Sequence, residues 1–115
     1  MNQTNDNDNA SQSDRSRPLV EIHPDLVNQW CCVKYRGDIY PGIITDVDEV
    51  DVEVNCMSLV GKCKTLSNRY YWPMFADKTW YSADDVLGLI PEPKKISKRH
   101  VEIDYVHFEE LSKML

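Results

Sequence analysis

The stretch from Arg36 to Cys56, RGDIYPGIITDVDEVDVEVNC, constrains the fold of this chain more than any other segment. It holds two apolar alternations on either side of an acidic turn. Period-two alternation with β-branched residues on one side and acids on the other is typical of half-buried antiparallel strands. The stretch therefore predicts a β-hairpin whose inward residues are Ile39, Pro41, Ile43, Thr45 and Val47, followed by Val50, Val52, Val54 and Cys56. The opposite face of the first strand is predicted to carry Tyr40, Gly42, Ile44 and Asp46.

Further short strands are predicted on both sides of this hairpin. WCCVKY (30–35) forms the strand before it, and Arg36-Gly37-Asp38 is the tight turn between them. TWY (79–81) and LGLIP (87–91) supply a fourth and a fifth strand, joined by a single turn capped by Ser82. Pro41 cannot donate to a ladder, so an edge or a bulge is expected there. Five short strands without a long helix between them predict a small, mainly β barrel.

The chain has 115 residues, enough for one small domain and its tails. Residues 1–17 are almost entirely polar and are expected to be disordered. Residues 18–93 are assigned to the barrel with a lead-in, in which Leu26 and Val27 dock on the domain. Residues 94–115 are assigned to a basic linker and a short C-terminal helix, DYVHFEELSKML, with Asp104 as its N-cap. The apolar stripe of this helix is predicted to contain Val106, Phe108, Leu111 and Met114 or Leu115.

Charge and hydropathy exclude several classes of protein. The net charge of −6 and the pI near 4.9 argue against a barrel that wraps nucleic acid, because phosphate binding requires a basic face. The tail offers a weaker phosphate contact through Lys94, Lys95, Lys98, Arg99 and His100. No apolar run approaches the roughly 18 residues of a membrane helix, and the polar N-terminus lacks a secretory core. An intracellular protein is predicted, nuclear in preference to cytoplasmic, and an adhesive role for the Arg-Gly-Asp turn is therefore disfavoured.

The residues with the most reactive side chains show no spacing that indicates catalysis. The four cysteines, at 31, 32, 56 and 63, lack the paired spacing of a structural zinc site and are interpreted as core and rim residues. His23, His100 and His107 have no nucleophile near them in sequence, and no phosphate-binding glycine loop is present. The sequence therefore predicts a non-enzymatic protein without a metal or another cofactor.

The segment from Trp30 to Met57 resembles the first three strands of a Tudor domain. The similarity lies in an aromatic residue at the end of the first strand, a Gly-Asp turn, the run Ile-Tyr-Pro-Gly-x-Ile, and a Val-x-Val strand. WYSADDVLGLIP (80–91) is similar to the fourth strand, single turn and closing strand of the same fold. The resemblance implies a five-stranded SH3-like barrel.

The resemblance also implies an aromatic cage for methylated lysine or arginine. Tyr35 and Tyr40 match its members from the first hairpin. Asn55 and Met57 stand where the family shows aromatic residues, so the second half is expected from the loop residues Tyr70, Tyr71, Trp72 and Phe75. Asn55 or Asp77 is expected to contact the methylammonium group. Aromatic faces attract such cations, and five acids between residues 46 and 53 are expected to attract basic tails.

Two functions are therefore expected for one binding module. The first is a reader of methylated lysine or arginine in a basic peptide, such as a histone tail or an Arg/Gly-rich segment of a chromatin or RNP protein. The second is an adaptor that binds a protein partner through the barrel or the C-terminal helix without reading methylation. Three or more aromatic side chains converging on one open pocket beside an acid would favour the first.

Overall fold

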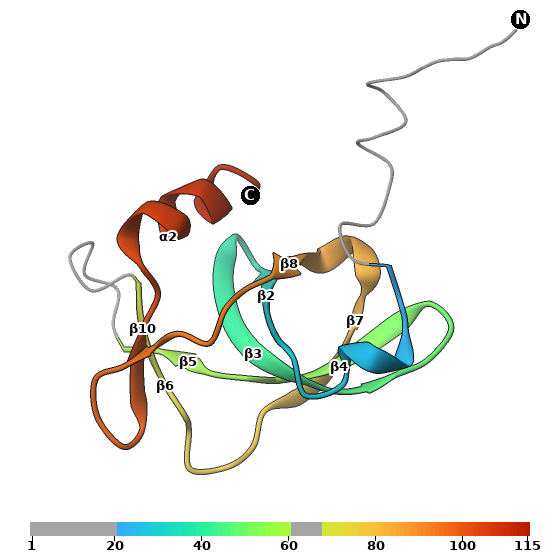
Figure 1. Cartoon of the computed structure of the whole chain (residues 1–115), viewed down its shortest axis with the longest axis horizontal. Coiled ribbons are helices and arrows are strands. Elements are labelled where there is room, and N and C mark those ends of the chain that lie inside the picture. The colour runs from blue at the N-terminus through green and yellow to red at the C-terminus, as the bar shows by residue number, and fades with distance from the viewer. Residues whose placement is uncertain (1–20, 61–67) are drawn as a thin grey trace, which may run out of the picture.

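The computed structural model describes residues 21–60 and 68–115, and these residues form two antiparallel sheets and one short C-terminal helix (Figure 1). The prediction of a mainly β fold with a C-terminal helix is confirmed. The tail predicted to be disordered, residues 1–17, lies outside the described residues.

The larger sheet contains the five strands that the sequence predicts. Its spatial order is β7-β4-β3-β2-β8, all antiparallel. The strands are β2 (Trp30–Tyr35), β3 (Asp38–Val47), β4 (Asp51–Cys56), β7 (Lys78–Ser82) and β8 (Val86–Leu89). The 3-10 helix η4 (Ala83–Asp85) joins β7 to β8, and the Ser82 side chain caps it by accepting a hydrogen bond from the Asp84 N–H. The predicted single turn capped by Ser82 is thus confirmed.

Arg36-Gly37-Asp38 lies in the hairpin turn between β2 and β3. Tyr35 pairs with Asp38, which leaves Arg36 and Gly37 as a two-residue loop. Both have positive φ angles, 50° and 83°, as the favoured two-residue hairpin turn requires. The tripeptide is therefore a turn element, as predicted.

The smaller sheet was not predicted as such. Its order is β5-β6-β10-β9, with β5 (Ser58–Leu59), β6 (Arg69–Tyr71), β9 (Lys94–Lys95) and β10 (His100–Glu102). The prediction of a basic linker after residue 93 is wrong, because β9 and β10 form a hairpin there. Val101 pairs with Tyr70 and both are buried, so two apolar residues hold this charged segment on the domain.

The C-terminal helix α2 (Tyr105–Ser112) begins where the sequence predicts. The Asp104 carboxylate caps it by accepting a hydrogen bond from the His107 N–H. Leu111 is buried and Phe108 packs against the core, whereas Val106 is 65% exposed, so the packed stripe is narrower than predicted. Within residues 21–60 and 68–115 no helix has the length and apolar character needed to span a bilayer.

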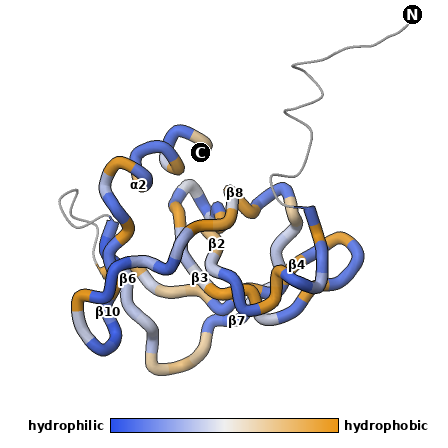
Figure 2. Tube along the Cα trace, in the orientation of Figure 1, coloured by the Kyte–Doolittle hydropathy of each residue, from blue (hydrophilic) through white to orange (hydrophobic). Residues whose placement is uncertain are grey.

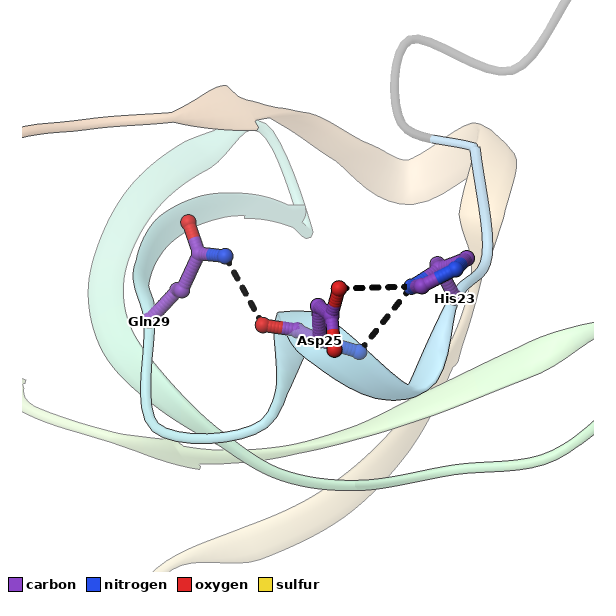
Figure 3. A network of polar contacts seen from close by, with 3 residues as sticks. All are labelled: His23, Asp25 and Gln29. Carbon is purple, nitrogen blue, oxygen red and sulfur yellow. Dashed lines mark hydrogen bonds and ion pairs between the residues drawn. The ribbon is translucent and has the colours of Figure 1, made fainter.

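The lead-in before β2 closes one end of the core. The 3-10 helix η2 (Pro24–Leu26) is capped by His23, whose Nδ1 accepts a hydrogen bond from the Asp25 N–H, and the Gln29 amide donates to the Asp25 carbonyl at 2.8 Å (Figure 3). These bonds position Leu26, which is 6% exposed. The predicted docking of Leu26 is confirmed, and Val27 is half-buried.

Two hydrophobic clusters share the larger sheet. The first lies on the face that carries Val33, Ile44, Val52 and Val54. The second lies between the two sheets and α2 and contains Cys32, Ile39, Met57, Tyr70, Leu87, Ile90, Val101, Ile103 and Leu111. Because β2 has Cys31 and Val33 in one cluster and Cys32 in the other, both of its faces are buried. This two-sided burial explains the weak alternation of WCCVKY.

The predicted faces of β3 hold only in part: Ile39 and Pro41 are buried as predicted, but Ile44, predicted on the opposite face, is buried as well. Val33 pairs with Tyr40, and Ile44 pairs with Val54, so Tyr40 and Ile44 lie on the face of the first cluster. Ile39 belongs to the second cluster. An irregularity between Ile44 and Asp46 then shifts the register, which places Val47 against the first cluster as well.

Gly42 is required where β3 and β4 approach closely. A Cβ atom at this position would lie 2.6 Å from the Asn55 carbonyl oxygen and 2.6 Å from a Val54 methyl carbon. We expect Gly42→Ala to lower the free energy of unfolding by about 1–3 kcal/mol, as overpacking does. Gly88→Ala is the matched control, because nothing lies within 4 Å of its Cβ position. Urea denaturation would measure both, and equal midpoints for the two variants would contradict the prediction.

Candidate functional site

A pocket of about 330 Å³ opens between the first hairpin, the β4–β5 junction and the start of β7. Three tyrosines from three different strands line it, together with one carboxylate. The complete lining is Tyr35, Tyr40, Cys56, Met57, Ser58, Leu59, Asp77, Thr79 and Tyr81. The pocket thus combines aromatic walls with a single ionisable acid.

The first wall consists of the two tyrosines that the sequence places there. Tyr35 pairs with Asp38 across the turn, so Tyr40 is its diagonal neighbour on the adjacent strand. The two ring centroids are 6.4 Å apart at 65°, an edge-to-face arrangement. Tyr35 is 45% exposed, whereas Tyr40 is half-buried and contacts both hydrophobic clusters. The position above Gly42 offers no room for the Tyr40 ring, because Val54 and Asn55 of β4 fill it.

The guanidinium group of Arg36 shows how the Tyr35 ring interacts with cations. Its carbon atom lies 5.1 Å from the ring centroid, within the range of a cation–π contact. Arg36 does not line the pocket. The Tyr35 ring is therefore already paired with one positive charge outside the pocket.

The second wall is Tyr81, which the sequence analysis did not select. It lies on β7 opposite Val52, and its hydroxyl group is 3.4 Å from the Cys56 sulfur. Burial raises the pKa of Tyr81, and the contact with Cys56 raises it further. Burial also raises the pKa of Cys56, to about 11, although its hydrogen bond with Tyr81 acts in the opposite direction. Both groups are neutral at pH 7, and a thiol with so high a pKa is a poor nucleophile.

The acid of the pocket is Asp77, which β4 holds in place. The Asp77 carbonyl accepts a hydrogen bond from the Cys56 N–H at 2.9 Å, and its own N–H donates to Asn55 Oδ1 at 3.2 Å. Asp77 is exposed, and no ion pair is formed by its carboxylate within residues 21–60 and 68–115. Asn55, predicted to contact a ligand, does not line the pocket and instead positions Asp77.

The loop aromatics predicted to complete a cage lie elsewhere. Tyr70 is completely buried, and its hydroxyl group donates to the Ile39 carbonyl at 2.8 Å, so its predicted ligand contact is wrong. Trp72 packs on Trp30 with ring centroids 5.6 Å apart. Tyr71 packs on His100, and Phe75 is 85% exposed. None of these four lines the pocket.

The signal that could have identified Tyr81 is the strand TWY itself. Alternation places Thr79 and Tyr81 on one face of that strand and Trp80 on the other. The predicted fourth strand lies beside the third, whose inward residues are valines. Tyr81 could therefore have been predicted to pack against those valines at the edge of the first cluster. The segment from Tyr70 to Phe75 is the stronger sequence signal, because four aromatic residues occur there within six residues.

The acidic turn lies too far away to act as a rim. Asp48 terminates the β3–β4 hairpin by accepting hydrogen bonds from the N–H groups of Val50 and Asp51. Asp51 and Cys56 are five residue steps apart along β4, about 17 Å of extended strand. This exceeds the Debye length of about 10 Å at 0.1 M salt, so Asp48 and Asp51 add little attraction at the pocket. The nearer Glu53 carboxylate accepts a hydrogen bond from the Thr45 hydroxyl group.

The other thiols lie outside the pocket. Cys31 and Cys32 are buried and unbridged, and burial raises the pKa of Cys32 to about 12. Among the described residues, no three His, Cys, Asp or Glu side chains are grouped so that they could hold a metal ion. Cys63 lies outside the described residues.

Comparisons of the chain with protein-family models, with curated proteins and with solved structures found no match. What the pocket binds must therefore be inferred from its own residues. Three phenol rings and one carboxylate form a surface suited to an organic cation, since ring faces attract positive charge and Asp77 balances it.

Proposed function

We propose that the protein is a non-enzymatic binding module that reads a methylated lysine or arginine in a basic peptide. The observation that carries the proposal is the convergence of Tyr35, Tyr40 and Tyr81 on one open pocket beside Asp77. A methylated ammonium has few hydrogen-bonding options, so aromatic faces and one carboxylate are better partners for it than a polar cleft.

The connectivity of the larger sheet supports the same proposal. Strands β2, β3, β4 and β7 lie side by side in that order, with β5 and β6 inserted in the chain between β4 and β7, and β8 returns beside β2 after a single 3-10 turn. This is the arrangement that the resemblance to Tudor domains implies, with the pocket at the first hairpin. Methylated histone tails and Arg/Gly-rich segments are the basic partners that such a module would bind, and a nuclear location is proposed with them.

The chemistry of the lining argues against an enzyme. Besides the phenols, the potential nucleophiles in the pocket are a thiol of raised pKa, the hydroxyl groups of Ser58 and Thr79, and the Asp77 carboxylate. No histidine lines the pocket to serve as their base. The lining therefore favours binding over covalent chemistry.

A specific observation favours the adaptor as the second candidate. Met74 and Phe75 are 84% and 85% exposed in the loop that leads to Asp77. Exposed large apolar residues side by side are common at protein–protein contacts. An adaptor would use these side chains without discriminating between methylated and unmethylated partners.

Titration with matched peptides would separate the two candidates. One basic peptide is prepared with an unmodified, dimethylated or trimethylated lysine, and a second with unmodified or dimethylated arginine. We expect at least tenfold tighter binding of a methylated form, equivalent to about 1.4 kcal/mol. Calorimetry would measure the affinities. Equal affinity for all forms would refute the reader and support the adaptor.

A further inference from the structure

The smaller sheet has an outer face that the proposed function does not use. Tyr70 and Val101 point into the second cluster, so their neighbours along each strand point outward. In register across the strands, Ser58, Tyr71 and His100 form one outward row, and Arg69, Glu102 and Lys94 form the next. We call the surface formed by Arg69, Tyr71, Lys94 and His100, together with Lys98 and Arg99 of the adjoining β9–β10 turn, the basic sheet face.

The basic sheet face is positively charged in a protein that is acidic overall. Residues 94–100 contain four Lys or Arg residues and no acid, whereas the whole chain carries a net charge of −6. Figure 2 shows this hairpin as mainly hydrophilic. The one acid in the two rows, Glu102, is already paired with Arg69 at 3.0 Å. The acidic β3–β4 turn lies at the opposite end of the molecule in Figure 1, so it does not neutralise this face.

Two aromatic rings lie among the basic side chains of this face. The Tyr71 and His100 ring centroids are 5.8 Å apart, with an interplanar angle of 34°. Arg99 is held beside them, because its Nε and Nη2 atoms donate to the Trp72 carbonyl at 3.2 and 2.7 Å. The remaining N–H groups of this guanidinium stay available to a ligand.

We propose that the basic sheet face binds single-stranded nucleic acid. Lysine and arginine side chains would contact phosphates, and the exposed ring of His100, supported by Tyr71, would stack on a base. A single strand is favoured over a duplex, because only unpaired bases present their faces for stacking. The site adjoins the tyrosine-lined pocket, because Ser58 of the first row also lines that pocket. A nucleic acid strand and a methylated peptide would therefore bind side by side.

Fluorescence anisotropy with the full chain would test the proposal. The probes are labelled 12-nucleotide strands of thymidine and of uridine, together with a duplex of equal length. We expect both single strands to bind more tightly than the duplex. The logarithm of the binding constant is expected to fall linearly with the logarithm of the salt concentration. The expected slope is about −2, which corresponds to about three phosphate contacts. Tighter binding of the duplex, or equal binding of polyglutamate, would overturn the proposal.

Charge-matched variants would locate the site. Lys94→Ala with Lys98→Ala is expected to weaken binding at least fivefold and to make the salt slope shallower by about 1.4. Lys78→Ala with Lys113→Ala removes the same charge from exposed positions outside the basic sheet face, and is expected to change affinity less than twofold. His100→Ala is expected to weaken binding severalfold, because the base loses its stacking partner, and to leave the salt slope nearly unchanged. Equal losses in the two double variants would overturn the assignment.

Discussion

Tyr70→Ala is expected to lower the free energy of unfolding by about 3–5 kcal/mol, the range for removing a large buried aromatic side chain. Tyr70 is completely buried in the second cluster and joins it to β3 through the hydrogen bond to the Ile39 carbonyl. Small domains are stable by only about 5–15 kcal/mol, so the variant should unfold at a far lower urea concentration. Tryptophan fluorescence would follow the transition, since Trp30 and Trp72 pack beside this cluster.

Two further substitutions identify the source of the loss. Tyr70→Phe keeps the ring but leaves the Ile39 carbonyl without its donor, so a cost of about 1–3 kcal/mol is expected. Tyr71→Phe changes a neighbouring hydroxyl group on the outer face and should cost less than about 0.5 kcal/mol. A Tyr70→Ala variant as stable as Tyr71→Phe would show that the two sheets do not depend on this side chain.

Much of the larger sheet could be predicted from local sequence because its signals are local. The turn at Arg36 and Gly37 depends on two residues with positive φ angles, and the Asp104 cap depends on a single side chain. The inward residues of β4 also follow its alternation, since Val52, Val54 and Cys56 are all buried. Each of these features requires no knowledge of distant contacts.

The faces of β3 could not be predicted because alternation alone does not say which face meets which cluster. Ile39 and Ile44 are both buried although they lie on opposite faces. The register shift between Ile44 and Asp46 then exchanges the faces partway along the strand. The hairpin of β9 and β10 was missed for a similar reason, because its apolar partner, Tyr70, lies about 30 residues earlier in the chain.

Two of the three aromatic residues that line the candidate site could be predicted from the sequence. Tyr35 and Tyr40 are close in sequence and adjacent in the hairpin, so local pattern brought them together. Tyr81 joins them only through the pairing of β7 with β4, which is a long-range contact. The four aromatic residues between positions 70 and 75 were predicted to complete the cage because they are close together in sequence. In the structure, Tyr70 is part of the core and Trp72 packs on Trp30.

The position that best separates binding from folding is Tyr35, not Tyr40. Tyr40 contacts both clusters, so its removal would also destabilise the fold. Tyr35 is 45% exposed and its ring faces the pocket and the Arg36 guanidinium. Trp80 is 44% exposed, lies on β7 beside the site and does not line the pocket, which makes it a control of matched exposure.

Tyr35→Ala is therefore expected to weaken binding of a methylated peptide about tenfold, or about 1.4 kcal/mol, while the free energy of unfolding changes by less than about 1 kcal/mol. Tyr35→Phe keeps the ring and should retain most of the affinity. Trp80→Ala should bind as the unmodified protein does, because its ring faces away from the pocket. Calorimetric titration gives the affinities and urea denaturation the stabilities. If Tyr35→Ala and Trp80→Ala lose affinity equally, the peptide does not enter the tyrosine-lined pocket; if only Tyr35→Ala loses it, the peptide's cation is bound there.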